Sequence, residues 1–105
     1  MAKDDYFVIA YKILKYLYEC LKKGLTPNLE VLSAEYFSIG KSYWDYIIDN
    51  LYEDEYITGV MVFSSCTKVT ESTTITPKGI AYLEENSMFK KIKGTLKDVR
   101  DMLPL

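Results

Sequence analysis

The sequence predicts a single α+β domain in which helices surround one two-stranded hairpin. Three observations predict it: helical apolar spacing in the first half, a change to strand-like composition near residue 56, and a Thr-Pro pair near residue 76 that restarts a helix. The chain has 105 residues, of which 49% are hydrophobic and 27% charged. That length suffices for one modest core and not for two.

The first predicted helix covers residues 4–23. Asp4 or Asp5 can cap its start, and Gly24 can end it. Its polar positions recur every three or four residues and form one narrow solvent stripe, consisting of Lys12, Lys15, Glu19 and Lys22. The apolar positions flank this stripe, with Phe7, Ala10, Leu14, Leu17 and Leu21 on one side and Tyr6, Ile9, Ile13, Tyr16 and Cys20 on the other. We expect so apolar a helix to be covered on two sides.

A second helical region follows a turn at residues 26–28. A short helical stretch is expected from Leu29 and another over residues 33–38. Gly40 then precedes a longer helix from Ser42 to about Glu55. Its inward stripe follows the spacing i, i+3, i+4, i+7 and consists of Trp44, Ile47, Ile48 and Leu51. Its opposite face carries Ser42, Asp45, Asp49 and Glu53.

A hairpin is predicted after this helix. Residues 56–63, YITGVMVF, are rich in β-branched and aromatic side chains, as strands are. Residues 64–67 form the expected tip, and residues 68–76 form the returning strand. The candidate contact residues at this tip are Ser64, Ser65, Thr67 and Lys68.

Two helices are predicted to close the chain. Thr76 can cap the first of them, and Pro77 fits its first position because the missing N–H costs nothing there. This helix runs to Glu85 and is followed by a last helix after Ser87. The last helix carries a two-heptad apolar seam formed by Phe89, Ile92, Leu96, Val99 and Leu103. Two heptads are too few for an isolated coiled coil, so the seam needs another surface to cover it.

Helix, short helix, helix, strand, loop, strand and helix is the element order of a winged-helix (winged helix-turn-helix) domain. The sequence therefore predicts a winged helix with a two-stranded β wing over residues 1–86. An extra C-terminal helix over residues 87–105 serves packing or dimerisation of the same domain. Residues 76–83, TPKGIAYL, have the Thr-x-x-Gly-x-x-x-Leu spacing found where the wing strand enters a helix in many bacterial winged-helix proteins.

Three further segments resemble the YjcQ-like family: MAKDDYF at residues 1–7, YWDYIIDNL at residues 43–51 and YITG at residues 56–59. These are small winged-helix proteins of Firmicutes and their prophages. The resemblance covers nearly the whole chain and implies a winged helix of bacterial or phage origin in the cytosol. The family is known as a fold without an established biochemistry, so the resemblance implies no functional residues.

The composition argues against an enzyme. Histidine is absent, which removes the commonest general base and metal ligand, and no Gly-rich phosphate loop is present. We expect no catalytic residue, cofactor, metal or small-molecule substrate. Cys20 and Cys66 do not have the spacing of zinc ligands. We favour free thiols in a reducing cytoplasm, and a disulfide between the two is the alternative. No signal peptide is found, and the longest apolar run, residues 6–11, is too short to span a membrane.

The helix over residues 42–55 occupies the place of a recognition helix, which enters the major groove in winged-helix DNA-binding proteins. Its candidate contact surface consists of Lys41, Ser42, Asp45, Asp49 and Glu53, so three acids would face phosphates with one base to help. The wing adds Lys68 and Glu71, whose opposite charges give it a net charge of zero. We therefore favour a non-enzymatic binding module of regulator type that acts through a protein partner or a homodimer. The alternative is a sequence-specific DNA-binding transcriptional regulator, which fold analogy supports.

Charge is concentrated in two segments. Residues 45–55 hold five acids and no base, and residues 90–100 hold five bases and one acid. Two solvated helix faces would explain this pattern, and complementary patches that meet across a dimer are the other explanation. The seam of the last helix can cover the first helix of its own chain or the same surface of a second copy. We favour the homodimer.

Overall fold

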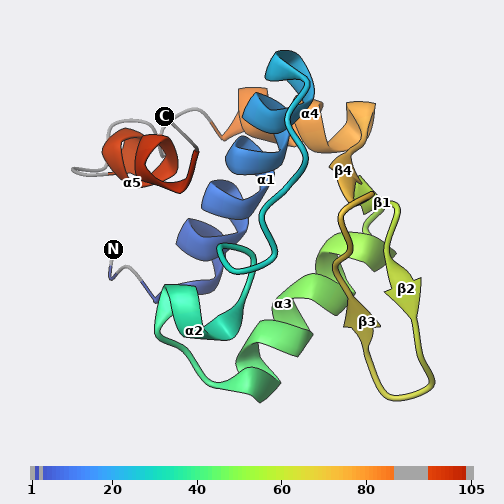
Figure 1. Ribbon diagram of the computed structural model, residues 1–105. Coiled ribbons are helices and arrows are strands. Elements are labelled where there is room, and N and C mark those ends of the chain that lie inside the picture. The colour runs from blue at the N-terminus through green and yellow to red at the C-terminus, as the bar shows by residue number, and fades with distance from the viewer. Residues whose placement is uncertain (1, 3, 87–94, 104–105) are drawn as a thin grey trace.

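The protein is mixed α+β in a computed structural model, which describes residues 2, 4–86 and 95–103 (Figure 1). The elements, in chain order, are α1 (Tyr6–Lys23), α2 (Ala34–Phe37), α3 (Lys41–Glu53), β1 (Ile57–Thr58), β2 (Met61–Val62), β3 (Thr67–Lys68), β4 (Thr74–Ile75), α4 (Pro77–Glu85) and α5 (Thr95–Met102). The α+β class and the succession of helices, hairpin and helix agree with the sequence prediction. None of the helices in the described ranges is long and apolar enough to cross a membrane.

The helix α1 lies at the centre, and α3, α4, α5 and β4 all pack against it (Figure 1). Gly24 ends it as predicted, in the left-handed conformation with a φ of 68°. Asp5 is the N-cap residue, although its side chain makes no capping hydrogen bond. Because other elements surround α1, its buried side chains supply much of the core.

Three side chains of α1 differ from the predicted pattern. Lys12 was placed on the solvent stripe, yet its exposed fraction is only 6%. It lines a cavity together with Phe37 from the end of α2 and Met102 of α5, so these two elements cover that part of the stripe. Phe7 and Leu21 were placed among the apolar contacts and are exposed, because both lie in terminal turns of α1.

The region between α1 and α3 contains one short helix rather than two. The stretch from Leu29 is a turn, and α2 follows, with the Ser33 hydroxyl accepting a hydrogen bond from the Tyr36 N–H at 3.2 Å. The helix α3 ends two residues earlier than predicted, since Glu55 adopts a positive φ of 65°. Its inward stripe is confirmed, because Trp44, Ile47, Ile48 and Leu51 are all buried.

The hairpin consists of two short antiparallel ladders instead of two continuous strands. Ile57 of β1 lies opposite Ile75 of β4, and Val62 of β2 lies opposite Thr67 of β3. A turn between the ladders is held by the hydroxyls of Thr70 and Thr73, which donate to the Gly59 carbonyl at 2.6 and 3.1 Å.

Gly59 is required at that turn for two reasons. Its φ is 76°, in the left-handed region that side chains disfavour. A Cβ atom at this position would also collide with the backbone carbonyl of Ser72. The close approach of the two arms therefore depends on the missing side chain, and it interrupts the strands that composition alone predicts as continuous.

The helix α4 begins as the sequence predicts. The Thr76 hydroxyl accepts a hydrogen bond from the Gly79 N–H at 3.0 Å, and Pro77 occupies the first helical position. Leu83 is buried and Ile80 is half-buried, both on the inward side. The helix α5 lies alongside α1 (Figure 1).

Candidate functional site

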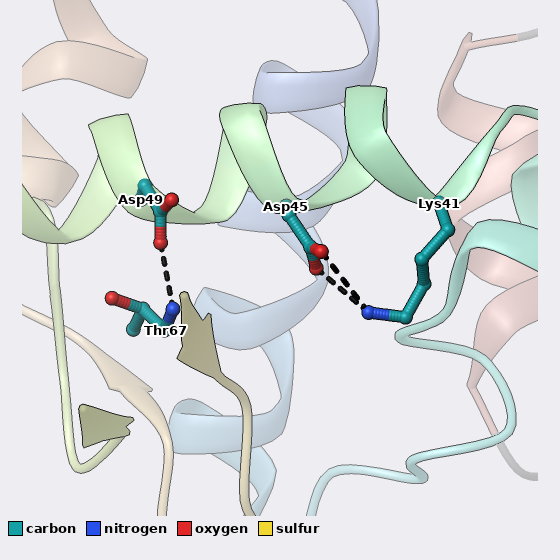
Figure 2. Close-up of polar contacts among 4 residues, drawn as sticks. All are labelled: Lys41, Asp45, Asp49 and Thr67. Carbon is teal, nitrogen blue, oxygen red and sulfur yellow. Dashed lines mark hydrogen bonds and ion pairs between the residues drawn. The ribbon is translucent and has the colours of Figure 1, made fainter. Parts of the chain in front are cut away.

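The one base on α3 is already paired within the helix. The Lys41 Nζ donates to both carboxylate oxygens of Asp45, at 2.9 and 3.1 Å (Figure 2). The two side chains meet because residues four apart lie one above the other on a helix. The hydrogen bond stabilises the ammonium group and raises the pKa of Lys41 above its ordinary value. This pairing neutralises the cation that a recognition helix would offer to a phosphate.

Asp49 faces the hairpin rather than open solvent. Its Oδ1 accepts a hydrogen bond from the Thr67 backbone N–H at 2.7 Å, which ties β3 to α3 (Figure 2). The prediction that Asp49 lies on a solvated face is therefore wrong, since β3 runs along this flank of α3 and leaves the residue half-buried. Ser42 and Glu53 are exposed, in agreement with their predicted positions.

The hairpin tip is shorter than predicted. The Phe63 N–H donates to the Cys66 carbonyl at 2.8 Å and closes the tip over Ser64 and Ser65, which are exposed. Thr67 was placed at the tip, but it is the first residue of β3 and is only 6% exposed, because its backbone docks on α3. Lys68 is exposed beside it. Of the four predicted contact residues of the tip, Ser64, Ser65 and Lys68 are exposed and Thr67 is not.

An aromatic cluster borders α3 and was not predicted. The Tyr6 ring contacts Phe7 and Tyr46 edge to face, with centroid distances of 5.1 and 6.0 Å. Tyr46 is 59% exposed on the outer side of α3, between the turns that carry Ser42 and Glu53. Helical phase alone could have identified it, since 46 is four residues after 42 and seven before 53.

Burial is the main reason that the pKa of the Tyr6 phenol is raised to about 12. The negative charge of Asp54 adds to this effect, followed by the neighbouring phenols of Tyr46, Tyr82 and Tyr56. The Tyr6 phenol therefore stays protonated at neutral pH. Its surroundings on α3 and the following turn are acidic.

The strand β2 presents a second unpredicted apolar surface. Met61, Val62 and the following Phe63 are all exposed. The sequence carried a signal for this, because residues 60–63 are all apolar and lack the alternation of a half-buried strand. In a hairpin that packs on one side only, such a run must leave apolar side chains in solvent.

The predicted seam of the last helix is described in part. Val99 is buried and Leu103 is half-buried against the core. Phe89 and Ile92 lie outside the described residues. The side chain of Leu96 lies outside them as well, and so do the side chains of residues 90–98 in the basic segment. The described part of α5 packs on α1 of the same chain, and Met102, which the seam did not include, is buried with it.

Two cavities adjoin these elements. The larger, of about 620 Å³, lies between the start of α1, the end of α2 and α5, and its charged lining residues are Asp4, Lys12 and Asp101. The smaller, of about 160 Å³, lies between α2, α3 and β3, and both Lys41 and Lys68 line it. Over the described ranges, no group of three or more acidic or cysteine side chains could hold a metal ion. Cys20 and Cys66 are free thiols; Cys20 is buried, which raises its pKa.

Comparison with known proteins identifies a family. The family model described as "YjcQ protein" matches residues 11–102, which is most of the chain. No curated protein matches, and no solved structure matches.

Proposed function

The chain belongs to the YjcQ family, and we propose that it is a non-enzymatic winged-helix binding module of regulator type that acts through protein contacts. In this proposal α3 is the recognition helix and β2 with β3 is the wing. The partner is a second copy or another protein. We further propose that the module works in the cytoplasm, as the family resemblance implies.

The observation that carries the proposal is the charge state of the α3 surface. Lys41 is the helix's only base, and Asp45 neutralises it at 2.9 Å. Glu53, Asp54 and Glu55 follow at the exposed end of the helix. Such a surface opposes the release of counterions that supplies most non-specific DNA affinity. It suits a protein partner that brings its own cations and covers the Tyr46 ring.

DNA binding is the second candidate, and one observation favours it. Lys41 and Lys68 line the same small pocket between α2, α3 and β3, although α3 and the tip are far apart in sequence. Two lysines that converge beside a recognition helix could contact one phosphate. Asp45 lines this pocket as well, so the net charge there is smaller than two lysines suggest.

The test is fluorescence anisotropy with a labelled duplex of arbitrary sequence over a range of salt concentrations. We expect the wild-type Kd at physiological salt to be weaker than about 10⁻⁴ M, the weak end of non-specific binding. The double variant Asp45→Lys with Glu53→Lys changes the net charge from −2 to +2 and should create salt-sensitive binding. Asp49 is left unchanged because it holds β3.

The matched control is Glu30→Lys with Glu85→Lys, which makes the same charge change at two exposed sites away from α3. A gain confined to the α3 variant supports the proposal. Equal gains in both variants would show that α3 is not what prevents binding. Micromolar wild-type affinity with a steep salt dependence would favour the DNA-binding alternative instead.

A further inference from the structure

We propose that the outer edge of β2 pairs antiparallel with β2 of a second copy, with Val62 on the two-fold axis. This inference rests on the proposed function, because it names a second copy as a partner and locates the contact. Figure 1 shows β2 at the outside of the molecule, with β3 between it and α3. The edge that faces away from β3 is therefore open to another chain.

The hydrogen-bond pattern of the hairpin shows which backbone groups face outward. The Phe63 N–H points inward, to the Cys66 carbonyl, and the register places Met61 opposite Lys68 and Val62 opposite Thr67. Inward and outward positions alternate along an antiparallel strand. The N–H and C=O of Val62 consequently point away from β3, toward the open edge.

The two edges of this ladder differ in how they are covered. On the β3 edge, the outward N–H of Thr67 is bound by the Asp49 carboxylate at 2.7 Å. On the β2 edge, the register places the Val62 N–H on the side away from β3, and no turn, loop or side-chain group of the described residues is its acceptor. A carboxylate thus blocks strand addition on one edge only, and the other edge keeps a donor and an acceptor that a new strand can use.

The side chains of β2 offer none of the usual protection against pairing. Natural edge strands are guarded by lysine, proline or bulges, whereas residues 60–63 read VMVF. Val62 is 60% exposed, and Met61 and Phe63 are exposed on the other face of the strand. An uncharged apolar edge matches a second copy of itself, because a two-fold interface uses the same patch on both chains. A phosphate backbone would find no cation on this strand.

The proposed register makes a geometric prediction. With Val62 opposite itself in a hydrogen-bonded pair, the two Cα atoms lie about 5.5 Å apart, within disulfide range. The two Met61 residues would be displaced by two positions along the strands, so their Cα atoms would lie about 8 Å apart. The same holds for the two Phe63 residues, and this distance is too long for a disulfide. Met61 of one copy would instead face Phe63 of the other.

The experiment introduces one cysteine at a time into the full chain with Cys66→Ser and follows air oxidation on non-reducing gels. Val62→Cys should form covalent dimers, and Met61→Cys or Phe63→Cys alone should not. An equal mixture of Met61→Cys and Phe63→Cys chains should cross-link to each other. Comparable cross-linking of all three single variants would indicate random collision and overturn the proposal. Far-ultraviolet circular dichroism verifies that each variant is folded.

Sedimentation equilibrium of the unmodified chain gives a second readout. We expect dimers to appear at high micromolar concentration and to be abolished by Val62→Lys, whose exposed side chain should leave the unfolding midpoint unchanged. A monomer at millimolar concentration together with no Val62→Cys dimers would overturn the proposal. That result would not affect the proposed function, because a different protein can still bind α3. Tight duplex binding, by contrast, would refute the proposed function and would not affect the pairing of β2.

Discussion

The hydrogen bond between Asp49 and Thr67 connects the hairpin to α3, and Asp49→Ala removes it. The N–H to Oδ1 distance is 2.7 Å, and the acceptor is half-buried. Hydrogen bonds to charged groups contribute about 1.5–3 kcal/mol, and partial exposure to water favours the lower end of that range. We therefore expect the free energy of unfolding to fall by about 1.5 kcal/mol. The midpoint of thermal unfolding should fall by roughly 5–10 °C.

Urea denaturation monitored by Trp44 fluorescence measures this change. Asp49→Asn serves as the matched control, because it keeps an oxygen acceptor without the charge and should lose about half as much. Asp45→Ala breaks only the exposed pair with Lys41 and should cost less than about 1 kcal/mol. Hydrogen exchange at the Thr67 amide should accelerate in Asp49→Ala. An unchanged exchange rate, or a loss no greater than that of Asp45→Ala, would refute this account of the hairpin.

Three further predictions concern the core, the turn and the pH dependence. Trp44 is 6% exposed, and its ring stacks on Phe37 with a centroid distance of 5.8 Å. Trp44→Ala should therefore cost about 3–5 kcal/mol in urea denaturation followed by circular dichroism, because the variant lacks the tryptophan signal; a near-neutral result would show that the phase of α3 is wrong. Gly59→Ala should cost upward of about 2 kcal/mol in the same assay, because of its positive φ and the collision with Ser72, and a stability equal to wild type would contradict it. The pKa of Tyr6 is about 12 in the folded chain, compared with an ordinary value of 10.0. Its contribution to the free energy of unfolding is therefore fully present below pH 10 and is lost as the pH rises to 12. Tyr6→Phe should reduce the fall in the free energy of unfolding between pH 10 and pH 12, and an unaltered fall would refute the raised pKa of Tyr6.

Most of the fold followed from local signals in the sequence. Gly24 ends α1, Thr76 and Pro77 start α4, and the stripe from Trp44 to Leu51 faces the core, because each depends on neighbours within one or two turns. Burial across elements was harder to predict. Lys12 follows a solvent-facing period and is nevertheless buried, since α2 and α5 reach it from distant parts of the chain.

The candidate site was predicted less completely for the same reason. Composition identified the acids of α3, but the partner of Asp49 lies 18 residues away, and no periodicity within α3 reveals it. The interruption of the strands at Gly59 depends on a backbone contact with Ser72 that composition does not encode. The exposure of Tyr46 and of the apolar run of β2 could have been predicted from the sequence. It was not predicted, because aromatic and β-branched residues are expected to lie in the core.

A titration of the isotope-labelled wild-type chain with duplex DNA at low ionic strength separates a protein-binding α3 from a DNA-binding α3, because electrostatic binding to DNA is strongest under those conditions. Amide resonances of Ser42 and Tyr46 report on α3, and those of Ser65 and Lys68 report on the hairpin. If α3 is a protein-binding surface whose base is neutralised by Asp45, these resonances should show no saturable shifts. Saturable shifts on both α3 and the hairpin tip that disappear as salt is added would show instead that α3 binds DNA.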